Sequence, residues 1–312
     1  MPGFEAMYLN ITKRFREKIF RKPTQAIIET TNRCNLNCPF CMVGMQNELL
    51  AEHGTTAHDL MTRPLGSMSE DTFNAVKREL RTFGIKKVYL HFQGEPMLNK
   101  LTPKFASELK KDRFEVGIFT NGLVFNDENI AELADIEIDL IRFSVDGASE
   151  KSYQQNRVGG QFIKVYENMK KVVHAHDGKK TRIEWQFLAL RNNEHEVNEA
   201  KEMASELGIN FFVKGFRETD PHLAPTNQTY RAKALKKPCT DIYHQVGIYW
   251  NGDVVPCCYD VDGKEIMGNL NDNSIVKIWN SEKYKLFRKK IAAFNKSTEA
   301  EPIICKSCLR WK

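Results

Sequence analysis

The chain of 312 residues has no apolar stretch that approaches the roughly 18 residues of a membrane-spanning helix. Its N-terminus lacks the apolar segment and the small-residue cleavage site of a secretory signal peptide. Hydrophobic residues make up 41% and charged residues 28% of the sequence, which is ordinary for a globular protein. We therefore expect a cytoplasmic protein with no membrane partner.

Cysteine is missing from the long central part of the chain, between Cys41 and Cys239. The eight cysteines fall into two groups, three of them before residue 42 and five of them after residue 238. A disulfide framework would spread its cysteines through a small secreted chain. Clustered cysteines in a cytosolic chain are instead typical of metal sites.

The sequence also lacks a basic stripe interleaved with aromatic residues, the pattern expected of nucleic-acid binding. The net charge of +6 is mild, and much of it lies in two segments, 13–22 and 283–290. Both segments read as solvated faces of helices, the first within a basic N-terminal helix at residues 1–24. Such a patch would also suit an acidic redox partner.

Apolar strand patterns alternate with amphipathic helix patterns over the central part of the chain. The six predicted strands cover residues 25–31, 88–92, 114–120, 138–145, 182–190 and 209–213. This alternation predicts an α/β fold with a parallel sheet, either open or curled into a partial barrel. Ligands bind such sheets at the carboxyl ends of the strands.

Several other segments carry local predictions. Residues 46–66 have no strong periodicity and suggest a lid or a disordered loop. Residues 217–238 read as a linker, and Asn251-Gly252 predicts a type I′ turn within a hairpin at 246–256. A final helix is expected at 275–291. The hairpin and this helix would form a small second domain at residues 239–312.

Polar motifs follow four consecutive predicted strands. They are Cys34-x3-Cys38-x2-Cys41, Gln93-Gly94-Glu95-Pro96, Thr120-Asn121-Gly122 and Ser144-Val145-Asp146-Gly147. Any one of these motifs is also an ordinary turn sequence. Together they indicate a site at the carboxyl rim. A closed metal site normally takes four protein ligands, so three thiolates leave one position for a small molecule.

The cysteine spacing, with Phe40 before the last cysteine, resembles the signature of the radical S-adenosylmethionine (radical SAM) superfamily. Gly94-Glu95-Pro96 resembles its GGEP-type motif, although Gln93 replaces the first glycine. The resemblance implies a (βα)6 partial TIM barrel over residues 25–216. It also implies a [4Fe-4S] cluster on Cys34, Cys38 and Cys41, with SAM on the fourth iron.

The same resemblance implies a set of SAM-binding residues. They are Phe40, Gly94, Glu95, Asn121, Ser144, Asp146 and Arg157. Glu95 would accept hydrogen bonds from the SAM amine, Ser144 and Asp146 would face its carboxylate or ribose, and Phe40 would lie near the adenine. Arg157 is a candidate partner for the SAM carboxylate, and its alternative is a surface arginine.

Four of the late cysteines, Cys239, Cys257, Cys305 and Cys308, form a compact set of four ligands. Spacing alone leaves a structural Zn(Cys)4 site as an alternative to an iron–sulfur cluster. The unit resembles a twitch domain, the shortened relative of the SPASM domain, which implies a second, auxiliary [4Fe-4S] cluster. The chain lacks the further cysteines that a complete SPASM domain uses.

Cys258 is left over from both sets. It is either a small buried apolar residue or a hydrogen-atom donor or acid–base group that faces the substrate. Asp260 is a second candidate base, with a role in a turn as its alternative. Glu184 and Gln186 share one face of the fifth predicted strand, and the sequence does not decide whether they point inward.

The ligand spacing is similar to that of 2-deoxy-scyllo-inosamine dehydrogenase-type enzymes, which oxidise a secondary alcohol. The resemblance implies an oxidoreductase that takes a hydrogen atom from a sugar, aminocyclitol or nucleotide-sugar and passes an electron to the auxiliary cluster. Flavodoxin or ferredoxin would supply the reducing electron.

Three other functions stay open. One is a ribosomal-peptide or protein maturase, disfavoured because no leader-binding domain is evident before residue 25. Another is a redox-neutral epimerase with Cys258 as the hydrogen donor. The last is a non-catalytic zinc-binding module.

Overall fold

The computed structural model describes residues 22–53, 61–217, 220–233, 239–293, 303–306 and 308. The predicted N-terminal helix (1–24) lies outside the described residues except for its last three positions. No helix among the described residues is long and apolar enough to cross a membrane.

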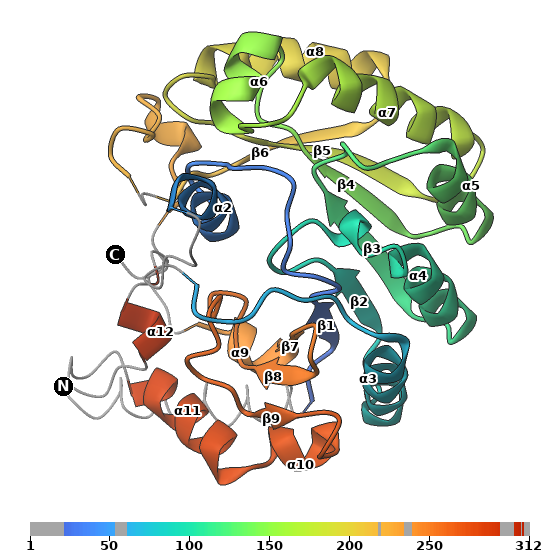
Figure 1. The fold of residues 1–312 in the computed structure, drawn as a ribbon, viewed down its shortest axis with the longest axis vertical. Helices are drawn as coiled ribbons and strands as arrows, with labels where there is room; N and C mark the ends of the chain where they lie inside the picture. The colour runs from blue at the N-terminus through green and yellow to red at the C-terminus, as the bar shows by residue number, and fades with distance from the viewer. Residues whose placement is uncertain are drawn as a thin grey trace, which may run out of the picture.

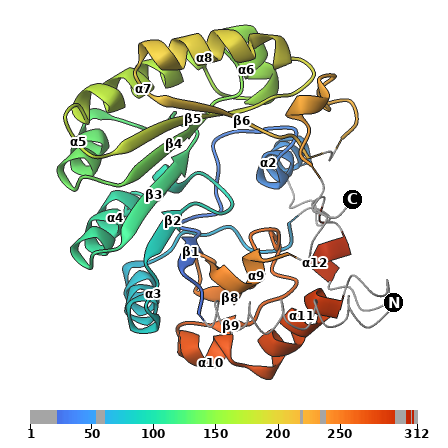
Figure 2. The ribbon, with the colours of Figure 1, turned by 180° about the vertical axis from the view of Figure 1, so that it is seen from behind.

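Six parallel strands form the central part of the sheet, in the order β6-β5-β4-β3-β2-β1. They are β1 (Gln25–Ile28), β2 (Lys87–Leu90), β3 (Glu115–Thr120), β4 (Leu140–Ser144), β5 (Arg182–Leu188) and β6 (Asn210–Lys214). Every strand pairs with its neighbour in the chain, as right-handed strand–helix–strand units do. The sheet curves into an open arc (Figures 1 and 2), which confirms the predicted partial barrel.

The helices between these strands cover the outer side of the arc (Figures 1 and 2). They are α3 (Glu70–Phe83), α4 (Thr102–Lys111), α5 (Asp127–Asp135), α6 (Glu150–Asn156), α7 (Phe162–Ala175) and α8 (Val197–Glu206), with short 3-10 turns at η1 (Pro96–Leu98) and η2 (Glu194–Glu196). Their buried apolar faces and the outward side chains of the strands form one continuous core.

The sequence of α3 shows why such a helix forms where it does. The Ser69 hydroxyl accepts a hydrogen bond from the Thr72 amide at 3.2 Å and caps the first turn. Gly84 ends the helix with a φ of 82°, a conformation that glycine adopts without steric cost. The buried side chains of Phe73, Val76 and Leu80 recur at helical spacing and face the sheet.

Side chains alternate between the two faces of the strands, and this alternation decides what lines the barrel. Trp185 packs on Phe162 of α7, with ring centroids 6.4 Å apart, on the outer face. Glu184 and Gln186 therefore point to the inner face, where Glu184 pairs with Arg142 of β4 at 2.7 Å. Both predicted residues therefore lie on the inner face of the barrel.

The sheet continues beyond β1 into the C-terminal part of the chain. After α9 (Asp241–His244), β7 (Gln245–Ile248) pairs in parallel with β1, and β8 (Asp253–Val255) and β9 (Gly268–Asn269) complete a nine-stranded sheet. The Gln25 and Gln245 side chains hydrogen bond across the junction at 3.1 Å. The hairpin thus joins the barrel sheet, and the predicted domain boundaries at 216 and 239 stay predictions.

The turn between β7 and β8 differs from the sequence prediction. Gly252 has a φ of 88°, but Asn251 is absent from the residues with positive φ, and a type I′ turn needs positive φ at both positions. The Gly252 amide donates to the Tyr249 carbonyl at 2.9 Å. A longer connection with glycine at its left-handed position replaces the predicted turn.

The expected loop at 46–66 is also partly wrong, because α2 (Met42–His53) is a helix. Gly44 of α2 lies so close to the cysteine loop that an added Cβ would come within 2.3 Å of the Cys38 amide nitrogen. The helix packs locally against that loop, and such packing leaves little amphipathic pattern in the sequence. Residues 54–60 lie outside the described residues.

The predicted final helix is divided into α10 (Ile275–Trp279) and α11 (Glu282–Ala293), and a last turn, α12 (Ile303–Lys306), follows. The Ser281 hydroxyl accepts a hydrogen bond from the Tyr284 amide at 3.2 Å, so a serine cap interrupts the helix. The predicted linker contains a short 3-10 turn, η3 (Gln228–Tyr230).

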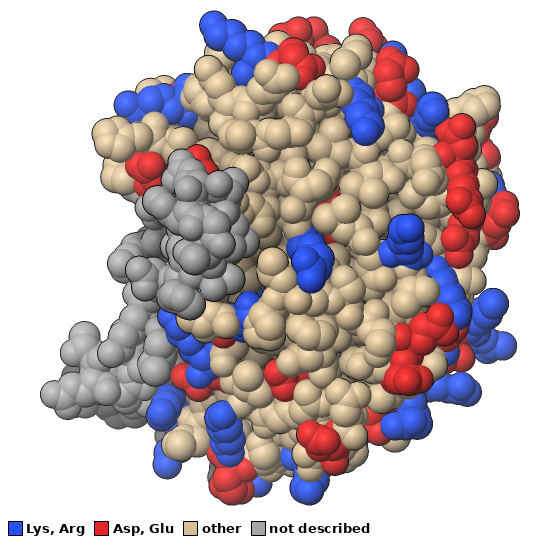
Figure 3. All heavy atoms as spheres, in the orientation of Figure 1, with Lys and Arg blue, Asp and Glu red and all other residues tan. Residues whose placement is uncertain are grey.

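Charged side chains of both signs lie mainly around the edge of the face seen in Figure 3, and uncharged atoms fill most of its middle. Among the described residues, the lysines and arginines on this face are therefore not gathered into a single patch.

Candidate functional site

The loop with Cys34, Cys38 and Cys41 lies directly after β1, at the carboxyl rim. The Asn47 amide of α2 donates to the carbonyls of Cys34 at 3.0 Å and Leu36 at 3.1 Å. These bonds hold the backbone of the loop at Cys34 and Leu36 against α2.

The three thiols influence one another electrostatically. Burial, with the nearby Glu95, Cys41 and Cys38, raises the pKa of Cys34 to about 12. Burial also raises the pKa of Cys38 to about 11, while the guanidinium of Arg157 opposes that shift. Thiolates gathered in such a place need a cationic centre, which an iron–sulfur cluster provides.

Glu95 lies at the end of β2 with its carboxylate buried. Its Oε1 accepts hydrogen bonds from Thr120 Oγ1 at 2.7 Å and the Met97 amide at 3.1 Å, and its Oε2 accepts from the Asn121 amide at 2.6 Å. Burial raises the pKa of Glu95, although these hydrogen bonds oppose the shift. A carboxylate has about four acceptor positions, so Oε2 keeps room for one more donor.

Gly94 and Asn121 hold the rim motifs to the cysteine loop. Gly94 has a φ of 76°, and an added Cβ would come within 2.6 Å of the Thr31 and Arg33 carbonyl oxygens. Asn121 Nδ2 donates to Asn35 Oδ1 at 2.9 Å. Both residues therefore support the loop that carries the thiols.

Asp146 and Arg157 form a buried ion pair beside the same loop. Asp146 Oδ2 lies 2.7 Å from both Nε and Nη2 of Arg157, and its Oδ1 accepts from the Leu188 amide at 2.7 Å. Arg157 Nη1 lies 3.9 Å from Cys38 Sγ, and its guanidinium lies 5.4 Å from the ring centre of Phe40. Arg157 is thus no surface arginine, and it links Asp146, Phe40 and a loop thiol.

Ser144 is the last residue of β4, on the same face of the strand as Arg142. Gln186 of β5 donates weakly to its hydroxyl at 3.5 Å. Arg157, held by Asp146, contacts the cysteine loop at Cys38. The predicted SAM-binding residues come together from four strand ends and one helix end.

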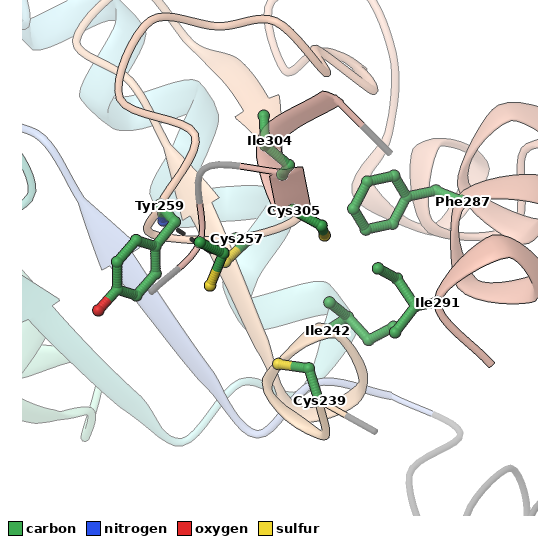
Figure 4. A pocket seen from close by; sticks show the side chains of 9 residues that line it. Cys239, Ile242, Cys257, Tyr259, Phe287, Ile291, Ile304 and Cys305 are labelled. Carbon is green, nitrogen blue, oxygen red and sulfur yellow. Dashed lines mark hydrogen bonds between the residues drawn. The ribbon is translucent and has the colours of Figure 1, made fainter. Parts of the chain in front are cut away.

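The second site is a small apolar pocket, lined by Cys239, Cys257, Cys305 and Cys308. Figure 4 shows the sulfur atoms of Cys239, Cys257 and Cys305 facing a common space. Apolar side chains form the rest of the wall: Ile242, Tyr259, Phe287, Ile291 and Ile304. Within the described residues no set of side chains is arranged closely enough to hold a single metal ion.

Cys257 and Cys258 differ in their surroundings. Cys257 lines the pocket, and its Sγ accepts a hydrogen bond from the Tyr259 amide at 3.4 Å. Cys258 Sγ accepts from Gln245 Nε2 at 3.8 Å and lies close enough to Lys214 of β6 to act on its charge. Cys257 and Cys258 thus link the pocket to the barrel.

Asp260 closes a turn. Its carboxylate oxygens accept from the Lys264 and Glu265 amides, both at 2.8 Å, and the side chain is 1% exposed. The Tyr249 hydroxyl donates to its carbonyl oxygen. These contacts match a role in a turn, which is the alternative given for Asp260 in the sequence analysis. A catalytic role for Asp260 stays a prediction.

A buried ion pair near the rim was missed from the sequence. Arg63 donates to both carboxylate oxygens of Glu29 at 2.9 Å, and its guanidinium lies 3.6 Å from the ring centre of Tyr249. It joins β1, the segment before α3 and the C-terminal hairpin. The available signal was an acidic residue directly after the apolar run of β1, because a buried carboxylate needs a partner.

With this geometry in place, the comparisons with known proteins decide the family. The model of the radical SAM superfamily matches residues 28–183, half of the chain. The chain is a radical SAM protein. A second model, that of the SPASM iron–sulfur cluster-binding domain, matches residues 239–309. Both matches confirm the resemblance seen in the motifs.

Known relatives of this radical SAM protein differ in what they act on. It is 25% identical over 309 residues to the tungsten-containing aldehyde ferredoxin oxidoreductase cofactor-modifying protein of Pyrococcus furiosus, covering 84% of this chain and 82% of that one. BtrN, solved in complex with AdoMet and 2-DOIA, matches with a TM-score of 0.59 and 17% identity over 92% and 93% of the two chains. SuiB of Streptococcus suis, solved with its precursor peptide SuiA, matches with a TM-score of 0.68 and 13% identity over 98% and 75%.

The radical SAM protein therefore has the enzyme class and the cofactors of its family: a [4Fe-4S] cluster with SAM in the barrel and an iron–sulfur cluster in the SPASM region. The two structural likenesses show the fold alone. Relatives bind either small molecules or peptides, so the substrate needs a separate argument.

Proposed function

We propose that this enzyme cleaves SAM reductively, abstracts a hydrogen atom from a small polar substrate and oxidises one of its alcohols to a ketone. The observation that carries the proposal is the pair Cys257 and Cys258. Cys257 lines the four-thiol pocket, and Cys258 accepts a hydrogen bond from Gln245 of β7, the strand that pairs with β1. An electron acceptor in the pocket would thus lie close to the barrel sheet.

The first site would fit a cluster with bound SAM because of the side chains that line it. Cys34, Cys38 and Cys41 would hold three irons, and Glu95 Oε2 has room for the SAM amine. The guanidinium of Arg157 is held by Asp146 between Cys38 and Phe40, where it would bind the SAM carboxylate. The reduced cluster with bound SAM supplies the 5′-deoxyadenosyl radical that abstracts hydrogen.

The fit of the second site rests on four thiols around an apolar pocket. Four protein ligands close the coordination of a cluster, so it would accept an electron and bind no substrate. Oxidation of the alcohol removes one hydrogen atom, one proton and one electron. Bound SAM would supply the acceptor of the hydrogen atom, and a base such as Cys258 would take the proton. The electron acceptor would be the cluster that Cys239, Cys257, Cys305 and Cys308 would hold.

Anaerobic reconstitution followed by product analysis tests this function. With dithionite and SAM, the wild type is expected to release 5′-deoxyadenosine, and a variant with Cys34, Cys38 and Cys41 changed to alanine is expected to release none. A turned-over sugar or nucleotide-sugar should lose about two mass units by mass spectrometry. Reconstituted protein that carries zinc, or that forms no 5′-deoxyadenosine, would contradict the proposal.

The second candidate function is modification of a peptide. It is supported by the similarity to SuiB, whose structure with a precursor peptide covers 98% of this chain. The same turnover in deuterated water separates oxidation of the substrate from its epimerisation. Oxidation of a small molecule incorporates no solvent deuterium at carbon, whereas an epimerase with Cys258 as donor places one deuterium at the reacting carbon.

A further inference from the structure

The inner face of the barrel holds more cations than the proposed chemistry uses. Arg142 of β4 stacks between the rings of Phe119 and Phe212, at 4.2 Å and 4.9 Å from their centres, and Glu184 neutralises it. Arg157 is neutralised in the same way by Asp146. Two further cations, Lys214 and Arg217, lie at the end of β6 and just after it.

Lys214 points into the barrel. Phe212, two residues earlier on β6, contacts Arg142 on the inner face, and strand alternation puts Lys214 on that face too. The lysine is solvent-accessible, yet the surrounding protein lowers its pKa by desolvation. Lys214 is therefore an exposed cation on the inner face of the barrel.

The charged groups around Lys214 do not neutralise its positive charge. Asp146 and Cys258 raise its pKa, whereas Arg157 and Arg217 lower it together with desolvation. Asp146 already accepts two hydrogen bonds from Arg157 and one from a backbone amide. Nearby His91 adds no charge, because burial, with Lys214 and Arg142, lowers its pKa to about 3.

Arg217 adds a planar donor to the same place. Its guanidinium lies 5.1 Å from the ring centre of Tyr259, the residue after Cys258. Its Nη1 is buried without a hydrogen-bond partner among the described residues. A buried, unpaired guanidinium nitrogen is costly unless a ligand accepts its hydrogen bond.

We propose that Lys214 and Arg217 bind a phosphate group of the substrate at the carboxyl end of β6, near Tyr259. The inference rests on the proposed function and narrows its substrate class to phosphorylated sugars or nucleotide-sugars. Two unneutralised cations match the double charge of a phosphate better than the single charge of a carboxylate. An aminocyclitol without phosphate carries the wrong sign of charge for this site.

Equilibrium dialysis of radiolabelled inorganic phosphate against the anaerobically reconstituted enzyme with SAM tests the site. Lys214→Met and Arg217→Gln are each expected to weaken phosphate binding about tenfold, and unlabelled phosphate should compete far better than acetate. Lys111→Met, which removes an exposed lysine at the end of α4, is the matched control and should bind phosphate like the wild type.

Iron content and absorbance of each variant show that it has folded and holds its clusters. Equal phosphate affinity in the wild type and both variants would overturn the inference, as would equal competition by acetate. Loss of SAM affinity with unchanged phosphate affinity would overturn it too, and would assign both cations to the SAM carboxylate. If the wild type releases 5′-deoxyadenosine but fails these tests, the proposed function stands and only the phosphate site is wrong.

Discussion

At the scale of single residues, Gly94 shows how strictly the rim is packed. Its φ of 76° and the Thr31 and Arg33 carbonyl oxygens within 2.6 Å of an added Cβ leave no space for a side chain. Gly94→Ala must displace the segment that leads into Cys34. We expect a loss of unfolding free energy above the roughly 1–3 kcal/mol of backbone strain alone, and a lower iron content. Urea unfolding and iron analysis measure both.

Gly208→Ala is the matched control for this prediction. Gly208 has a similar φ of 68°, but no atom lies within 4 Å of its added Cβ. It should therefore lose only the strain of the left-handed backbone, about 1 kcal/mol, and keep its iron. Equal losses in the two variants would show that the carbonyl cradle around Gly94 does not matter.

At the scale of elements, η2 supports the helix that presents Arg157. The Glu196 carboxylate of η2 accepts from the Ala148 amide at 2.7 Å and the Ser149 hydroxyl at 2.6 Å, and also from Ser152. These groups form the start of α6, and Arg157 follows its last residue. Anchoring the helix start in this way fixes the direction in which Arg157 leaves the helix.

Glu196 makes this anchor dependent on pH. Burial raises its pKa, but the hydrogen bonds from Ser149, Ser152 and Ala148 outweigh burial, so the pKa lies below the ordinary 4.5. A lowered carboxylate pKa stabilises the fold above pH 4.5, and this stabilisation is lost as the pH falls through the folded value. Glu196→Gln should cost about 1–3 kcal/mol at neutral pH and progressively less in acid.

Urea unfolding followed by circular dichroism from about pH 7 to about pH 2 measures that difference. Glu199→Gln, on the exposed side of α8, is the control and should change stability little at any pH. A wild-type-to-variant difference that stays constant across the range would refute the role assigned to the Glu196 charge.

At the scale of the whole molecule, the two cysteine sites are built separately around one continuous sheet. The enzyme is expected to bind about eight irons, and the double variant Cys305→Ala/Cys308→Ala about four, because only the pocket loses its ligands. Cys258→Ala, which changes the neighbour of the ligand Cys257, should keep all of them. Iron and acid-labile sulfide analysis after anaerobic reconstitution measures the counts.

Two results would contradict this division. If Cys258→Ala lost half of its iron, Cys258 rather than Cys257 would be the ligand, and its proposed role beside the substrate would be wrong. If the double variant lost all of its iron, the two sites would not be independent.

Local patterns in the sequence were sufficient for much of this protein. Strand and helix periodicity predicted the six-stranded partial barrel, because each unit buries its own apolar face. The motifs at Cys34–Cys41 and Gly94–Glu95 predicted the family, because close contacts with a cluster and SAM restrict the residue types. Helix α2 and the break at Ser281 were missed, since one depends on packing against the cysteine loop and the other on a single serine cap.

The sequence by itself therefore determined the barrel, the family and the two groups of cysteines. Only the tertiary structure decided that β7 joins β1, that Glu184 points inward to Arg142, and that Arg157 lies buried against Asp146. It also brought Lys214 of β6 close to Cys258. The physical reason is distance along the chain: these contacts join residues 11 to 220 positions apart, and no local periodicity encodes which distant partner neutralises a charge.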